Sequence, residues 1–111
     1  MRGSTVVPRL VEGQNRKPRS TPLTTTEAKQ LREMMGAVVT QGSGRVLRSL
    51  QPPGVIAKTG TAEYGSGPPF KTHTWMVAAQ GDLAVAVFVA NGDSGSKTAG
   101  PLLRSFLAEA R

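Results

Sequence analysis

The residues with the clearest chemical potential form one short run, Lys58-Thr59-Gly60-Thr61. The run sets an ammonium group, two hydroxyl groups and a residue without a side chain next to one another. Because glycine leaves the backbone uncovered, another chain or a ligand can approach a strand closely at that point. On its own, the run is equally typical of a surface lysine, two threonines of high β-propensity and a glycine at a strand end. The surrounding elements must decide between these interpretations.

Other reactive residue types lack the partners that a catalytic or metal site needs. The chain has no cysteine, which excludes disulfides, thiol catalysis and zinc–thiolate sites. His73 is the only histidine and has no second type of ligand near it in the sequence, so we expect no metal and no cofactor. Glu63 has no carboxylate partner and is interpreted as a solvated strand end. His73 and Trp75 are interpreted first as packing residues, with Trp75 or Tyr64 as candidates for the rim of a binding cleft.

Composition and charge limit the class of protein. With 111 residues, 38% of them hydrophobic, the chain has the size of one small domain or of a piece of a larger one. Of its net charge of +7, residues 1–50 carry +6, which would suit a polyanionic partner. No aromatic residue lies among the basic ones to stack on bases, so nucleic acid is a disfavoured partner. We expect no signal peptide or transmembrane segment, because the longest apolar run, residues 83–90, has the length of a strand.

Apolar periodicity, glycine and proline predict the elements around the Lys58–Thr61 run. We expect an edge strand and a basic loop within residues 1–22, a helix over 23–42, three strands within 55–90 and a terminal helix over 98–110. The order predicts an α/β (α+β) fold, with an antiparallel sheet and packed helices.

Local signals support the two helices. Thr24 and Glu27 predict a capping box at the start of the first helix. Pro101 is tolerable in the terminal helix only within its first turn. Apolar residues at helical spacing give the first helix one apolar stripe, formed by Ala28, Leu31, Met34, Met35, Val38 and Val39.

The last two strands, over residues 74–80 and 83–90, are separated by Gly81 and Asp82. This dipeptide predicts a two-residue hairpin turn of the primed kind. The second strand carries apolar residues on both faces, so we expect it to be central in the sheet and covered by helices on each side.

In this context, the Lys58–Thr61 run resembles the Lys-Thr-Gly element of penicillin-binding proteins and serine β-lactamases. The match extends to the surroundings, with a strand that carries the run, a loop, His-Thr-Trp at 73–75, a hairpin and a terminal helix with Pro101 in its first turn. The chain is most similar to the end of a class B penicillin-binding protein of the actinobacterial type. The resemblance covers nearly all of the chain and implies part of the serine β-lactamase/penicillin-binding transpeptidase-like fold.

The resemblance implies a peptidoglycan D,D-transpeptidase, whose partners are peptidoglycan stem peptides and β-lactams. The Thr59 and Thr61 hydroxyls would bind the terminal carboxylate of the substrate, and Lys58 would add a positive field and assist proton transfer. The backbone N–H of Thr61 would be one of two oxyanion donors, each typically worth ~2.7–4 kcal/mol to the transition state. Gly60 would let the acyl-donor peptide pair with the strand edge, and Trp75 would touch substrate.

The same family needs a Ser-x-x-Lys nucleophile and a Ser-x-Asn element before its Lys-Thr-Gly element, and nothing before Lys58 fits either pattern. A Ser-x-x-Lys run does occur at 94–97, but it follows the motif and is interpreted as a helix cap. We therefore expect the C-terminal part of a transpeptidase domain, inactive alone, whose partner is the missing N-terminal part.

The family is membrane-anchored and extracytoplasmic, and in it further strands and a helical lobe cover the sheet. This chain alone should therefore show an uncovered sheet face. The uncharged residues 85–89 would then be an aggregation hazard.

Three alternatives stay open. A D,D-carboxypeptidase or a serine β-lactamase would use water as the acceptor, although the continuation Thr61-Ala62-Glu63 resembles transpeptidases more. A small basic module could bind nucleic acid or an anionic polymer through residues 1–50. The chain could also be the non-functional product of a truncated or mis-started reading frame.

Overall fold

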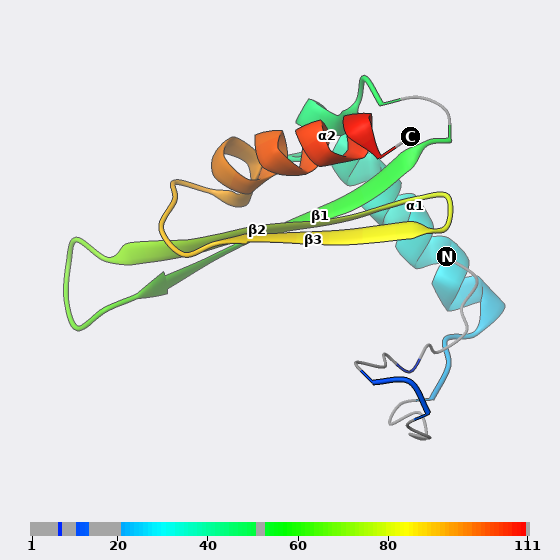
Figure 1. Cartoon of the computed structure of the whole chain (residues 1–111), viewed down its shortest axis with the longest axis horizontal. Coiled ribbons are helices and arrows are strands. Elements are labelled where there is room, and N and C mark those ends of the chain that lie inside the picture. Colours follow the sequence, from blue (N-terminus) through cyan, green and yellow to red (C-terminus); the bar gives the residue numbers. More distant parts are fainter. Residues whose placement is uncertain (1–6, 8–10, 14–20, 51–52, 111) are drawn as a thin grey trace.

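The computed structural model describes residues 7, 11–13, 21–50 and 53–110. Its elements are α1 (Thr25–Thr40), a 3₁₀ turn (Arg45–Leu47), β1 (Val55–Tyr64), β2 (Lys71–Gln80), β3 (Leu83–Val89), a π-helical turn (Gly95–Ala99) and α2 (Gly100–Glu109). The strands form one antiparallel sheet in the order β1-β2-β3, with α2 lying along one face (Figure 1). This is the expected fold class. Most of the edge strand and basic loop expected within residues 1–22 lies outside the described residues.

No helix within the described residues is both long enough and apolar enough to cross a membrane.

Helix α1 begins where the capping signal predicts. The Glu27 N–H donates to the Thr24 hydroxyl at 3.2 Å, and the Thr24 N–H donates to the Glu27 carboxylate at 2.8 Å. These bonds from Thr24 lower the pKa of Glu27, because they stabilise its charged form. Of the apolar stripe, Ala28 and Val39 are buried, whereas Met34 is 61% exposed. Helix α1 therefore gives only part of its apolar surface to the core.

The sheet is built from two hairpins. Gly81 opens the β2–β3 turn with φ +60°, the left-handed conformation that a primed two-residue turn requires. Residues 55–64 pair with residues 71–80 along their full length, across a loop at 65–70. Strand β2 therefore starts earlier than the expected residue 74, because the end of β1 continues to pair with it.

The core lies on one face of the sheet, between the strands and the helical elements. We call this side the helix-covered face. The opposite side, which we call the open face, carries the even-numbered residues 56–64 of β1, the odd-numbered residues 71–79 of β2 and residues 84, 86 and 88 of β3. The buried core consists of Val39, Leu47, Leu50, Val55, Ala57, Met76, Ala78, Ala99, Leu103 and Leu107.

Pro101 lies in the first turn of α2, as expected.

The expectation that the last strand is central and covered on both faces is wrong for the described part of the chain. Strand β3 forms one edge of the three-stranded sheet. Val85 and Val87 pack against the core, whereas Ala84 and Ala86 are exposed and Phe88 is 59% exposed on the open face. Apolar residues on both faces are typical of a strand that is buried on both sides, but among the described residues the helices lie on one face only. The expected uncovered face is therefore present among these residues.

Thr74 offers a test of the core. Its side chain is fully buried on the helix-covered face, and its Oγ1 has no hydrogen-bond partner among the described residues. A buried hydroxyl without a partner typically costs about 1–3 kcal/mol. We expect Thr74→Val, which keeps the shape, to raise the free energy of unfolding by about 1 kcal/mol, measured as a higher denaturant midpoint at unchanged m-value.

Thr98→Val is the matched control for this substitution. The Thr98 Oγ1 accepts a hydrogen bond from the Asp93 N–H at 3.0 Å. Because Thr98→Val removes this acceptor, it should lower the free energy of unfolding. A lower denaturant midpoint for Thr74→Val would contradict the prediction.

Candidate functional site

The register of the sheet decides where the backbone of the Lys58–Thr61 run points. In an antiparallel pair, hydrogen-bonded and non-hydrogen-bonded residue pairs alternate, and the pair closing the two-residue β2–β3 turn is hydrogen-bonded. Along β2, the backbone groups of the even-numbered residues therefore point toward β3 and those of the odd-numbered residues toward β1. Lys58 and Gly60 pair with odd-numbered residues of β2, so their N–H and C=O groups point toward β2. Those of Thr59 and Thr61 point to the outer edge of β1. The run thus presents polar backbone groups at a sheet edge.

Lys58 brings a positive charge to that edge. Its side chain is exposed, and its ammonium group donates a hydrogen bond to the Thr59 carbonyl oxygen at 2.8 Å, consistent with a carbonyl that does not bond to β2. The ion pair found among the described residues joins Lys29 and Glu33, so no such pair within them neutralises Lys58. Its charge remains available to an anion at the outer edge.

The two threonine hydroxyls lie on the helix-covered face, and each contacts an element outside the sheet. The Thr59 and Ser43 hydroxyl oxygens lie 2.8 Å apart, which ties the segment after α1 to the run. The Gly95 N–H donates to the Thr61 Oγ1 at 3.3 Å. Because that oxygen acts as the acceptor, the proton of the Thr61 hydroxyl is free to donate to another group.

Gly95 lies directly against the strands that carry the site. A Cβ atom at this position would lie 2.5 Å from the Trp75 carbonyl oxygen and 3.0 Å from both the Gly60 carbonyl oxygen and the Thr59 Cβ. Gly95 is not among the glycines with positive φ, so close approach, and not backbone conformation, requires glycine here. The π-helical turn that begins at Gly95 therefore packs the start of the terminal helix closely against β1, the strand that carries the Lys58–Thr61 run, and against β2.

Trp75 packs over Gly60 on the open face. The two residues are register partners, and a Cβ on Gly60 would lie 1.8 Å from the indole Nε1. The Trp75 ring also stacks on Phe88 of β3, with centroids 5.9 Å apart and an interplanar angle of 26°. In this structure the indole, and not a ligand, fills the space that the missing side chain of Gly60 leaves on the open face. Trp75 thus forms a wall beside the run.

His73 and Tyr64 have structural contacts at the far end of β1 and β2. Their rings stack with centroids 3.9 Å apart, and the His73 Nδ1 lies 2.8 Å from the Ala90 carbonyl oxygen. The Tyr64 hydroxyl donates to the side-chain oxygen of Asn91. These contacts hold the hairpin end to the segment after β3, as the packing interpretation of His73 predicts.

Ser94 is also a structural residue. Its hydroxyl accepts a hydrogen bond from the Lys97 N–H and caps the π-helical turn before α2. The Ser-x-x-Lys run at 94–97 is therefore a helix cap, as interpreted from the sequence.

Comparison with known protein families assigns the chain to one of them. The model of the penicillin binding protein transpeptidase domain matches residues 1–108. The chain belongs to this family. Penicillin-binding transpeptidase domains act in cell-wall synthesis and generally bind peptidoglycan and β-lactams. The comparison with curated proteins gave no match.

Two residues that contact the candidate site were missed in the sequence. Ser43 and Gly95 each contact a threonine of the run from a distant segment. A serine between two glycines after a helix, and a glycine in a polar segment, are typical of loops and carry no local signal of such contacts. Only the tertiary packing identifies them.

Proposed function

We propose that this chain provides the Lys-Thr-Gly substrate-binding strand of a peptidoglycan D,D-transpeptidase, together with one oxyanion donor. The observation that carries the proposal is the outward direction of the Thr59 and Thr61 backbone groups at the edge of β1. An extended acyl-donor peptide can add to such an edge as a further strand. The family assignment over residues 1–108 supports the same conclusion.

The side chains of the run support binding of an acyl donor that ends in a carboxylate. The Thr61 hydroxyl, oriented by the Gly95 N–H, can donate to a carboxylate oxygen, and the Thr59 hydroxyl lies on the same face. The ammonium group of Lys58 at the same edge would favour the anion. Trp75 would shield the binding edge on the open face.

The chemistry needs a serine nucleophile that we do not find in these 111 residues. In a complete site, the serine oxygen would attack the carbonyl carbon of the penultimate D-Ala and release the terminal D-Ala. The backbone N–H of Thr61 would then stabilise the oxyanion. An amine of a second stem peptide would displace the serine and form the cross-link. We propose that this chain contributes one wall of that site and is inactive alone.

Labelling with a fluorescent penicillin tests the inactivity. We expect no covalent labelling of the 111-residue chain, because the acylated serine must come from other residues. A denaturation-resistant label on this chain would contradict the proposal. A complete transpeptidase domain serves as the positive control.

Peptide binding tests the assignment of the strand. In an NMR titration with an acylated peptide that ends in D-Ala-D-Ala, we expect the largest amide shift changes at Thr59 and Thr61. Thr59→Val keeps the shape but removes a hydroxyl, and should weaken binding about tenfold, the value of one hydrogen bond to a charged group. Thr26→Val, in the exposed first turn of α1, is the matched control. Shift changes confined to other elements would refute the assigned role.

A further inference from the structure

The hydroxyl group of Ser43 contacts the Lys58–Thr61 run from the segment that follows α1. Its Oγ lies 2.8 Å from the Thr59 Oγ1, the usual distance for a hydrogen bond between two hydroxyls. Ser43 is exposed and Thr59 is half-buried, so the bond lies at the surface, where a ligand can reach it. Either hydroxyl can be the donor. The direction of the bond therefore depends on what else Thr59 binds.

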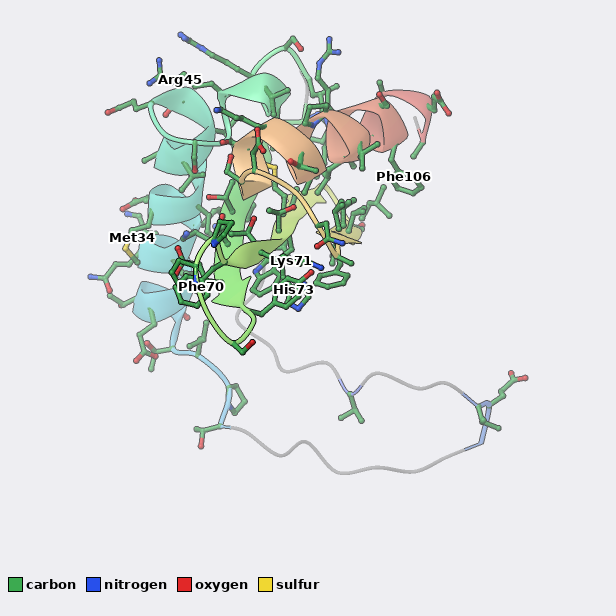
Figure 2. The ribbon with its side chains drawn as sticks, turned by 90° about the vertical axis from the view of Figure 1, so that its left-hand side faces the viewer. Met34, Arg45, Phe70, Lys71, His73 and Phe106 are labelled. Atoms are coloured by element: carbon green, nitrogen blue, oxygen red, sulfur yellow. The ribbon has the colours of Figure 1, made fainter. Side chains whose placement is uncertain are left out.

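The turn that carries Ser43 is held by the end of α1. The N–H groups of Gly42 and Gly44 both donate to the Val38 carbonyl oxygen, at 3.1 Å and 2.9 Å. The Arg45 Nε–H donates back to the Gly42 carbonyl oxygen at 3.2 Å, and Figure 2 shows Arg45 at the C-terminal end of α1, beyond its last turn. Helix α1 itself packs on β1. These contacts hold Ser43 next to the strand.

Binding of a carboxylate by Thr59 would give this bond one direction. A carboxylate only accepts hydrogen bonds, so Thr59 must donate its single proton to it. The bond to Ser43 then persists with Ser43 as the donor. The two bonds in series polarise one another, which strengthens both. The Gly95 N–H supports the Thr61 hydroxyl in the same way, because it donates to the Thr61 Oγ1 at 3.3 Å.

We propose that Ser43 is a positioning residue, which orients the Thr59 hydroxyl toward the terminal carboxylate of the acyl-donor peptide. This inference rests on the proposed function of the Lys58–Thr61 run as the substrate-binding strand. Ser43 acts through Thr59 and does not contact the reacting atoms.

The size of the effect follows from the freedom of a hydroxyl group. Without Ser43, the Thr59 O–H can take any of its staggered positions, and restricting it to one is worth about threefold in affinity. Polarisation by the bond that Ser43 donates adds to this effect. We therefore expect the loss of the Ser43 hydroxyl to weaken binding roughly three- to fivefold, less than the loss of the Thr59 hydroxyl itself.

An NMR titration with the acylated peptide that ends in D-Ala-D-Ala tests the role of Ser43. Ser43→Ala should weaken binding by the expected factor, whereas Ser43→Thr, which keeps a hydroxyl, should bind as the unaltered chain does. Ser43→Val has the shape of Ser43→Thr without the hydroxyl and should match Ser43→Ala. Full affinity in both Ser43→Ala and Ser43→Val would overturn the proposal.

Ser49→Ala is the matched control. The Ser49 Oγ accepts a hydrogen bond from the Arg104 Nε–H at 3.4 Å, so this variant also loses a serine hydroxyl that is bonded to another element. The bond does not involve the Lys58–Thr61 run, and peptide affinity should stay unchanged. An equal loss of affinity in Ser49→Ala and Ser43→Ala would show a general effect of weakened packing and refute the role of Ser43.

A Thr59→Val background shows whether Ser43 acts through Thr59. There, Ser43→Ala should cause no further loss of affinity, because the hydroxyl that Ser43 orients is absent. The same loss in both backgrounds would mean that Ser43 acts on the peptide independently of Thr59, which contradicts the proposal.

The same peptide with a C-terminal carboxamide gives a second readout. Because hydrogen bonds to charged groups are the stronger ones, Ser43→Ala should weaken binding of the carboxylate more than binding of the carboxamide. Equal losses for the two peptides would refute the orientation of Thr59 toward a carboxylate.

The unaltered chain and Thr59→Val separate this inference from the proposed function. If the unaltered chain shows no shift changes at Thr59 and Thr61, or if Thr59→Val binds as tightly, the proposed function fails and the role of Ser43 fails with it. If both behave as expected and Ser43→Ala keeps full affinity, only the role of Ser43 fails. An unchanged far-UV circular dichroism spectrum must accompany each variant.

Discussion

Replacing Gly95 with alanine should lower the free energy of unfolding by about 3 kcal/mol, at the upper end of the cost of overpacking. The added methyl group would lie 2.5 Å from the Trp75 carbonyl oxygen and 3.0 Å from the Gly60 carbonyl oxygen. Both atoms belong to the backbone of paired strands, so neither can rotate away as a side chain could. Either the sheet bends or the π-helical turn lifts off it.

The same displacement should disturb the Lys58–Thr61 run. If the turn moves, the Gly95 N–H loses its bond to the Thr61 Oγ1. The amide shift of Thr61 in an NMR spectrum should therefore change together with the stability. The thermal midpoint should fall by roughly 15 °C, given the usual relation between free energy and midpoint for small domains.

Gly36→Ala is the matched control for Gly95→Ala. Gly36 lies within α1, and a Cβ there would meet no atom within 4 Å. Because alanine is favoured over glycine inside a helix, this variant should gain roughly 0.5–1 kcal/mol. Equal thermal midpoints for Gly95→Ala and the unaltered chain would show that the turn does not rest on the strands as described.

Replacing Gly60 with alanine should cost about 2 kcal/mol, because the new methyl group would overlap the Trp75 indole. The nearest ring atom, Nε1, would lie at 1.8 Å. Unlike the backbone next to Gly95, this ring can move, since Trp75 lies on the open face and is only partly buried. The cost should therefore be smaller than that of Gly95→Ala, and Trp75 fluorescence should report the displaced ring.

A double-mutant cycle isolates this contact. In a Trp75→Ala background the space above Gly60 is empty, so Gly60→Ala should be close to neutral there. The coupling between the two positions should then be about 2 kcal/mol, within the range for residues in contact. The same loss in both backgrounds would mean that alanine at position 60 is unfavourable for a reason other than Trp75.

The sequence predicted those features of the fold that depend on interactions between residues close together in the chain. The capping box of Thr24 and Glu27, the left-handed Gly81 and the first-turn position of Pro101 all follow from interactions within a few residues. The strand that carries the Lys58–Thr61 run and the hairpin after it were predictable because they are close in sequence.

Features that depend on distant segments were predicted poorly. Apolar residues on both sides of β3 indicated two covering layers, but the described chain supplies only one. Met34 follows the helical periodicity and yet lies outside the contact region of α1. Ser43 and Gly95 contact the Lys58–Thr61 run because segments far apart in sequence meet at β1, and no pattern within either segment encodes that contact.

The alternation along β1 has a consequence for the length of the chain. Deleting one residue between Gly60 and the loop at 65–70, with the hairpin end kept in place, would shift the run by one position against β2. The hydroxyls of Thr59 and Thr61 would then move to the open face, and the backbone groups of Lys58 and Gly60 would replace theirs at the edge. A two-residue deletion would restore both directions. In a deletion scan of β1, binding of the D-Ala-D-Ala peptide should therefore depend on whether the number of removed residues is odd or even. Deletions within the loop at 65–70 should be tolerated whether that number is odd or even.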